Sequence, residues 1–351
     1  DTTFYYEGTS SGSFTSNSVL IQESTWTGTL PGGTNLTRVD FGSAVTELAS
    51  EAFANTNYLT EISFENATAL TELGSAAFEY SGLETINPPF PASLTVFGGN
   101  VFKDCNNLTN YYIPAGISAI PSGLYKGCGL LSVTIPNWIT SIGTYAFDNL
   151  NNLTELTFAS GSTLKTIDDF AFGSAYLLET VTLPNSITAM NEGCFGSCYK
   201  LTTLVLPPQI TKISNFLFNS CDVLESVVIP PGVTEIGVWA FQSCFALTSI
   251  TIPSSVATIG ALAFSNTTSL NEIIFDDAGA ITSVPTSGVF PTHTIAQLTY
   301  HNATDASDIP QILKDSISAA TTTTYSGAGA ITYPFVEGEN VTITDGGGTG
   351  V

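Results

Sequence analysis

A short phrase of alternating apolar and polar residues recurs along the chain. It reads L-x-x-V/I/L-x-I/L/F and often ends in Pro, as in "LLSVTIP", "LETVTLP", "LTTLVLP", "LESVVIP" and "LTSITIP". Alternation of this kind predicts a short β-strand with one buried face and one exposed face. The closing Pro has no N–H to donate, so it is expected to end the strand.

An aromatic residue precedes each of these phrases and recurs every 22 to 26 residues. Aliphatic residues usually lie eight and five positions before it. A unit of this size cannot close a core alone, so successive units are expected to stack and to align their aromatics in a continuous internal ladder. The ladder comprises Phe53, Phe78, Phe102, Tyr125, Phe147, Phe172, Phe195, Phe218, Phe241, Phe264 and, less regularly, Phe290.

Longer stretches carry a resemblance to a known family. "ITSIGTYAF", "VTEIGVWAFQSCFALTSITIP" and "ITKISNFLFNSCDVLESVVIP" resemble the BspA-type leucine-rich repeat, whose consensus is approximately I-x-x-I-x-x-x-A-F-x-x-C-x-x-L-x-x-V-x-I-P. The likeness covers about residues 35–300 in about ten or eleven turns. It departs from the consensus where turns lack the Cys, in the stretched turns, and in "ITSVPTSGVF" near the end.

The resemblance implies a mainly β repeat protein. The expected fold is a curved leucine-rich-repeat solenoid with one parallel β-sheet face and short turns on the other, capped at both ends. The family occurs chiefly among surface and secreted proteins of microbes, which implies roles in adhesion or in binding host proteins. Fold alone does not fix function, so these roles are expectations.

Both ends of the repeat array are expected to be capped, because a terminal turn would otherwise expose its apolar face. Residues 1–34 are expected to form an N-terminal β cap, and residues 35–300 the solenoid. Residues 301–351 are expected to form a C-terminal cap with a short helix near 308–319, followed by a Gly-rich tail that resembles a linker. In that helix Asp308 is the expected N-cap, Pro310 lies in the first turn, and one face is apolar.

The net charge of the chain disfavours some classes of binding partner. Seven Lys+Arg against 30 Asp+Glu give a net charge of −23, which opposes binding to nucleic acid or to an anionic membrane surface. No apolar run reaches the 18 or more residues of a membrane-spanning helix, so direct membrane insertion is not expected. The start "DTTFYYEG" fits a cleaved secretory signal, a disordered N-terminus or a trimmed chain equally well.

Seven Asn-x-Ser/Thr triplets are candidate N-glycosylation sites, which favours an extracellular or cell-surface protein. In a chain this rich in Asn, Ser and Thr, several such triplets also arise by chance. Three of them share one repeat position just ahead of a predicted strand, where a glycan fits on a loop. The seven are Asn35, Asn66, Asn107, Asn152, Asn266, Asn302 and Asn340.

Six cysteines are present, and all but Cys194 lie three residues after a ladder aromatic. Stacked turns place such side chains in columns. The spacing suits a disulfide, but parallel side chains rarely adopt the required torsion, so buried free thiols are favoured over disulfides. A metal site is disfavoured because no His lies near "CFGSC". No cofactor is expected.

Residues able to perform catalysis are few. The two histidines, His293 and His301, lie in the irregular last turn, and no nucleophile elbow, zinc-binding helix motif or phosphate loop occurs. The pairs Asp168–Asp169 and Asp276–Asp277 could hold a hard cation, but they lack calcium-loop spacing, and a solvated surface is the favoured interpretation. The chain is therefore expected not to be an enzyme.

The outward-pointing residues of the predicted strands form the candidate binding face. Small hydroxyl and β-branched residues dominate it, which suits either a solvated strand face or a broad uncharged contact surface for a protein or glycan. It lacks a cluster of Tyr, Trp and Arg typical of a tight single-partner site. The residues are Tyr112, Thr134, Thr157, Thr182, Thr203, Val205, Ser226, Val228 and Thr251.

Three classes of function follow from this face. The favoured one is surface recognition or adhesion. The first alternative is a structural subunit of an extracellular sheath, wall or filament, in which copies of the chain bind one another. The remote alternative is an ice- or mineral-binding surface built on the ladder of Thr hydroxyls.

Overall fold

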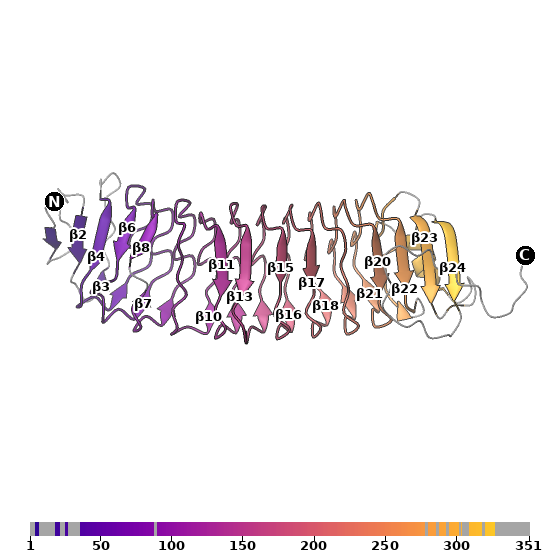
Figure 1. Ribbon diagram of the computed structural model, residues 1–351, viewed down its shortest axis with the longest axis horizontal. Helices are drawn as coiled ribbons and strands as arrows, with labels where there is room; N and C mark the ends of the chain where they lie inside the picture. Colours follow the sequence, from indigo (N-terminus) through magenta and orange to yellow (C-terminus); the bar gives the residue numbers. More distant parts are fainter. Residues whose placement is uncertain are drawn as a thin grey trace, which may run out of the picture. The chain divides into compact units, whose positions relative to one another are not determined.

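The computed structural model describes residues 36–87, 90–277, 280–285, 288–292, 295–301, 303, 309–317 and 320–326, together with three short strands in the first 35 residues. The chain divides into two compact units, Asp1–Leu201 and Thr202–Val351. Each unit is a parallel-strand β-solenoid, as the sequence predicts, with one strand following another along the chain (Figure 1).

In the first unit, the predicted phrase forms a ladder of parallel strands, here called the long-strand ladder. It comprises β1 (Phe4–Tyr6), β2 (Ser18–Ile21), β4 (Arg38–Phe41), β6 (Glu61–Ser63) and β8 (Thr85–Asn87), and then β11 (Ser132–Ile135), β13 (Glu155–Phe158) and β15 (Thr180–Thr182). Identical repeat positions pair, as in Val133 with Leu156 and Thr134 with Thr157. Within residues 1–34, β1 and β2 continue the same parallel sheet.

A second parallel ladder runs through the first unit where the sequence predicts only turns. Its strands have two residues each: β3 (Thr25–Trp26), β5 (Glu47–Leu48), β7 (Glu72–Leu73) and β9 (Val96–Phe97), and then β10 (Ala119–Ile120), β12 (Ser141–Ile142), β14 (Thr166–Ile167) and β16 (Ala189–Met190). The second residue of most of these pairs is the aliphatic five positions before the aromatic. This short-strand ladder gives each turn a second line of backbone pairing.

The second unit repeats this plan. Its long strands are β17 (Thr203–Val205), β20 (Ser249–Ile252), β22 (Glu272–Phe275), β23 (Ile295–His301) and β24 (Ala320–Ser326), and its short strands are β18 (Lys212–Ile213), β19 (Glu235–Ile236) and β21 (Thr258–Ile259). Strands β20, β22, β23 and β24 pair in parallel.

Helix α1 (Gln311–Ser316) connects β23 to β24, within the segment where the sequence predicts a helix. Its N-cap is Pro310, which makes no side-chain capping bond, so the prediction that Pro310 lies in the first helical turn is wrong. The predicted cap, Asp308, lies outside the described residues. Ile309 and Leu313 are buried, which anchors the helix by its apolar face. No helix in the described part of the chain is long and apolar enough to cross a membrane.

The predicted aromatic ladder is confirmed in both units. Neighbouring rings are nearly parallel, with centroids 5.5 Å apart for Phe78 and Phe102, 5.4 Å for Phe147 and Phe172, and 5.1 Å for Phe241 and Phe264. These side chains have no exposed surface. Burying each of them contributes about 1.5–3 kcal/mol, and the contribution depends on the next turn covering the ring.

The backbone around each ladder aromatic is held in an unusual conformation. In the turn of Phe147, for example, Tyr145 and Asn149 both have a positive φ, of 58° and 59°. Left-handed backbone costs a non-Gly residue roughly 1–2 kcal/mol. Hydrogen bonds between turns offset this cost, because the Tyr145, Phe147 and Asn149 N–H groups each donate to a carbonyl of the next turn, over 2.8–2.9 Å.

The long-strand ladder is interrupted at residues 110–113, where the sequence predicts a strand. Side chains supply the missing backbone bonds. The Asn110 amide bonds both the N–H and the carbonyl of Ile86, at 3.3 Å each. The Tyr111 hydroxyl donates to the Thr134 carbonyl over 3.2 Å and accepts from its N–H. The Tyr125 hydroxyl bonds the N–H and carbonyl of Tyr112, over 3.1 and 2.7 Å.

The ladder predicts a large loss of stability for Phe218→Ala. Removing this fully buried ring leaves a cavity, so the free energy of unfolding is expected to fall by about 3–5 kcal/mol. Urea denaturation measures the change. Phe245→Ala is the control, because Phe245 is 38% exposed and its loss should cost much less. Equal losses in the two variants would contradict the buried ladder.

Tyr125 replaces Phe in the ladder because its hydroxyl has backbone partners. Tyr125→Phe is therefore expected to lower the free energy of unfolding by about 1 kcal/mol, measured by urea denaturation. The control is Phe147→Tyr. Thr134 lies as far before Phe147 as Tyr112 lies before Tyr125, and its backbone N–H and carbonyl already bond the Tyr111 hydroxyl. The hydroxyl added at position 147 would therefore be buried without a partner and should destabilise the protein. An unchanged free energy of unfolding in Tyr125→Phe would show that the side-chain bonds do not support the interrupted ladder.

Candidate binding surface

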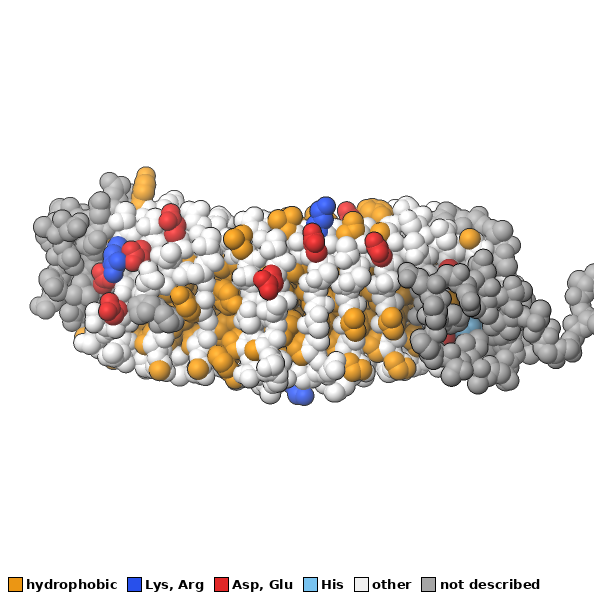
Figure 2. Space-filling view, in the orientation of Figure 1, with side chains coloured by type: hydrophobic (Ala, Val, Ile, Leu, Met, Phe, Trp, Pro, Cys, Tyr) orange, Lys and Arg blue, Asp and Glu red, His pale blue; other side chains and the backbone are white. Residues whose placement is uncertain are grey.

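In the first unit, the outward side chains of the long strands form a face, here called the strand face, that carries an exposed Glu155 on β13 but is otherwise uncharged in its middle turns. Thr134, Thr157 and Thr182 are exposed on β11, β13 and β15, whereas the residues between the outward positions, such as Val133 and Leu156, are buried. Register places Thr134 beside Thr157, and their hydroxyls bond over 2.9 Å. Figure 2 shows few charged side chains in the middle of this side of the molecule.

The strand face of the second unit exposes two large apolar side chains among hydroxyl residues. Val205 on β17 and Val228 are 75% and 78% exposed, the highest values among the exposed large hydrophobic side chains described. A bridge pairs Thr203 with Ser226, which puts these two valines at equivalent positions in adjacent turns. Thr203 and Ser226 are also exposed, and Thr251 is half-buried. The unit thus exposes two β-branched side chains to water at equivalent positions of adjacent turns.

Tyr112 does not lie on the strand face in the way the sequence predicts. It is in no strand, and the Tyr125 hydroxyl bonds its backbone N–H and carbonyl. Its ring packs edge to face on the Phe90 ring, with the two ring centroids 6.3 Å apart. It is half-buried. Alternation alone assigned it an outward position because the sequence does not reveal the interruption of the ladder.

Charge on the strand face is concentrated at the first turns described. Arg38 contacts Asp40 at 2.7 Å and Glu61 at 2.5 Å, and the hydrogen bond to Asp40 raises the pKa of Arg38. The single Arg38 offsets one of the two carboxylates, so the cluster keeps a net negative charge. The pairs contribute little stability because solvent screens them. They leave Thr134, Thr157 and Thr182 free of nearby ion pairs.

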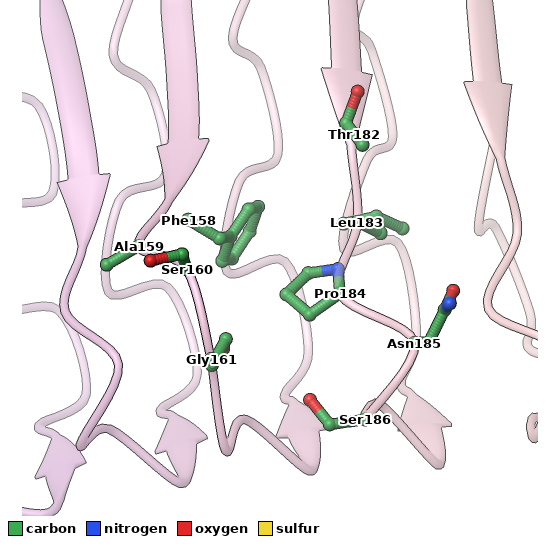
Figure 3. A pocket seen from close by; sticks show the side chains of 10 residues that line it. Phe158, Ala159, Ser160, Gly161, Thr182, Leu183, Pro184, Asn185 and Ser186 are labelled. Atoms are coloured by element: carbon green, nitrogen blue, oxygen red, sulfur yellow. The ribbon is translucent and has the colours of Figure 1, made fainter.

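A groove of about 360 Å³ lies where β13 and β15 end. One wall is Phe158 to Ser162 and the other is Thr182 to Ser186 (Figure 3). Five residues separate Phe158 from Leu164, whereas three separate Ile135 from Ile139 in the preceding turn. Two extra residues therefore build the first wall. Gly161 at its tip has a φ of +73°, with nothing within 4 Å of a Cβ placed there.

A pair of stacked aromatics, half-buried Tyr176 and exposed Tyr199, also lies in the turns before the long strands. Tyr176 and Tyr199 stack with centroids 4.9 Å apart and an interplanar angle of 10°, and neighbouring Leu177 is 43% exposed. Sequence reasoning missed this pair because it considered only outward strand positions. The available clue is that both tyrosines lie four residues after a ladder aromatic.

All six cysteines are free and buried. The Cys105 and Cys128 thiols donate to carbonyls of the preceding turn, those of Phe78 and Phe102, over 3.1 Å each. Burial raises the pKa of Cys105 and of Cys198 to about 12, and raises those of Cys128, Cys194 and Cys244. These thiols act as small apolar core residues.

The acidic and histidine side chains considered for catalysis or cation binding do not come together in one site in the part of the chain that the structure describes. Asp168 accepts a bond from Asn191 over 3.0 Å, and burial raises its pKa. His301 lies 3.5 Å from Asp276, while His293 is outside the described residues. Across the described ranges, no three His, Cys, Asp or Glu side chains cluster as metal ligands.

Four of the candidate glycosylation sites are exposed: Asn66, Asn107, Asn152 and Asn266. The other three, Asn35, Asn302 and Asn340, lie outside the described residues. Exposure satisfies the steric requirement for a glycan, and occupancy remains a prediction.

The repeat sequence matches a known family model. The model, described as a BspA type leucine rich repeat region (6 copies), matches residues 30–154, 118–246 and 234–306. The chain belongs to the BspA-type leucine-rich repeat family. No curated protein matches the chain significantly.

Solved structures share the fold of this BspA-type protein. A leucine-rich repeat protein from Bacteroides ovatus is 22% identical, with a TM-score of 0.57 over 83% of this chain and 84% of that one. The pneumococcal vaccine antigen PcpA is 16% identical, with a TM-score of 0.56 over 84% of this chain and 80% of its own. At these identities the likeness establishes the leucine-rich-repeat fold and no ligand.

The buried thiols of this BspA-type protein are expected to be unreactive. Burial keeps a reagent from all six thiols. For the five with a raised pKa the thiol also stays protonated at pH 8, and only the thiolate reacts. With a thiol-specific disulfide reagent, the native protein should react at none of the six cysteines, and the protein in denaturant at all six. Rapid reaction of a native thiol, or fewer than six after unfolding, would contradict the assignment of free buried cysteines.

Proposed function

We propose that the chain is a non-catalytic recognition or adhesion protein, located outside the cell or on its surface, that binds a protein or glycan through the strand face. The observation that carries the proposal is the exposure of uncharged β-branched side chains, above all Val205 on β17 and Val228 at the equivalent position of the next turn, while the residues between the outward positions are buried. Exposed apolar side chains beside hydroxyl groups suit a contact surface better than a solvated one.

The relatives support the location. PcpA is described as a pneumococcal vaccine antigen, a description that suits a protein exposed to a host. The exposed candidate glycosylation sites agree with an extracellular chain. The net charge of −23 weighs against nucleic acid and anionic lipid as partners, because like charges repel.

The strand face suits many weak contacts better than one tight contact. It offers Thr and Val side chains and no aromatic anchor, while the partly exposed Tyr176–Tyr199 stack lies in the turns before the strands. Aromatic residues supply most of the binding energy in compact interfaces. A ligand with repeated units therefore fits the face well, since many equivalent weak contacts add up to retention.

Replacing the two exposed valines is the test. Val205→Lys with Val228→Lys should reduce retention of the protein on an array of glycans and extracellular proteins at least tenfold, because each Lys must be desolvated at the contact. Val96→Lys is the matched control, since Val96 is 46% exposed but lies on the short-strand ladder. Its retention should equal that of the unchanged protein.

Sedimentation separates recognition from the structural alternative. A recognition protein should stay monomeric over a wide concentration range and retain ligand. Assembly that grows with concentration, with no retention on the array, would favour a subunit of a sheath, wall or filament and would overturn the proposal. Intact mass before and after glycosidase treatment reports whether the exposed Asn residues carry glycans.

A further inference from the structure

We infer that the groove between Phe158–Ser162 and Thr182–Ser186 binds a single neutral sugar ring, such as the terminal unit of a glycan. This inference rests on the proposed recognition function and names a ligand class and a site for it. Three features of the groove carry it: a fixed wall built by an insertion, a hydroxyl that has lost its usual partner, and a lining without charge.

The insertion that builds the first wall is held in place by the preceding turn. The Asn137 amide donates to the Ser160 carbonyl over 3.3 Å, and the Thr163 hydroxyl donates to the Asn137 carbonyl over 2.8 Å. The Ser162 hydroxyl accepts from the Leu164 N–H over 3.3 Å. The loop is thus tied at both ends while Gly161 projects from it, so the groove exists before any ligand arrives.

Ser186 on the opposite wall breaks a rule of the repeat. Hydroxyl residues nine positions before the ladder aromatic donate to the preceding turn, as Ser93 does to Leu70 over 2.7 Å and Ser255 does to Val233 over 2.6 Å. Ser186 occupies the same position, yet its buried hydroxyl has no hydrogen-bond partner. Figure 3 shows this hydroxyl directed toward the space between Gly161 and Pro184.

A buried hydroxyl without a partner costs about 1–3 kcal/mol, so a ligand that bonds it gains more than a ligand bonding a solvated group. The groove therefore favours a ligand that carries hydroxyl or carbonyl oxygens close together. Thr182 and Asn185 are exposed beside it. Their hydroxyl and amide groups add further hydrogen-bond donors and acceptors.

The rest of the lining selects against ions and against purely apolar molecules. No Asp, Glu, Lys or Arg lines the groove, so a charged ligand would find no counter-ion. Phe158, Leu183 and Pro184 supply apolar surface, while Ser160, Asn185 and Ser186 supply hydrogen-bonding groups. A sugar ring has an apolar C–H face and a rim of hydroxyls, which matches both parts. The volume lies within the range of small-molecule sites.

The experiment uses the full chain and the methyl glycosides of glucose, galactose, mannose, N-acetylglucosamine and N-acetylgalactosamine at millimolar concentration. Amide chemical shifts are followed by NMR. At least one glycoside should shift the amides of Gly161 and Asn185 saturably. Ser186→Ala should weaken that binding about fivefold, as expected for one lost hydrogen bond, without lowering the melting temperature.

Two variants serve as controls. Ser255→Ala removes the bonded hydroxyl at the same repeat position, so it should lower the melting temperature and leave sugar binding unchanged. Deleting Ser160 and Gly161 returns the turn to three residues between Phe158 and Leu164, so it should keep the fold and abolish binding.

The inference is overturned if no glycoside shifts these amides, or if Ser186→Ala binds as well as the unchanged protein. Its failure is distinguishable from failure of the recognition function. If the valine variant still loses retention on the array while the groove binds no sugar, recognition stands and the groove site falls.

Discussion

The ladder aromatic of each turn is buried only when the next turn covers it in register, and the rest of the structure depends on this stacking. The rings lie 5.1–5.5 Å apart in pairs such as Phe241–Phe264 and Phe78–Phe102. The same register that covers the rings forces the flanking residues into left-handed conformations and lines up the N–H and carbonyl groups that offset this cost. Apolar burial and backbone pairing therefore support one another in each turn.

Because register fixes the core, variation is tolerated on the outer positions and at the ends of the strands. The strand face differs between the units, with hydroxyls at Thr134 and Thr157 in one and valines in the other. Two departures from the repeat stand out. At residues 110–113 side chains replace backbone pairing, and after Phe158 an insertion opens the groove. The side-chain bonds at residues 110–113 keep the turns stacked. The insertion after Phe158 also leaves the stack intact, and it forms the groove beside it.

The sequence was sufficient to predict the elements with strong periodicity. The aromatic spacing predicted the ladder, and the L-x-x-V-x-I phrase predicted the long strands. The short-strand ladder was not predicted, because two-residue strands such as Thr166–Ile167 are too short to show alternation. The position of Tyr112 was wrong for a different reason: the bond to it from Tyr125 joins residues that no local pattern connects. The groove also escaped prediction, since the lost partner of Ser186 is visible only when turns are compared in space.

Hydrogen exchange of the backbone amides, resolved residue by residue, tests the stacking most directly. The N–H groups of Phe78, Phe147 and Phe241 are bonded to the next turn, so they should exchange among the slowest in their units, while Gly161 in the inserted loop should exchange fast. Fast exchange at a ladder aromatic in the middle of a unit would mean that the turn is not stacked in register, and would contradict the account of both the core and the strand face.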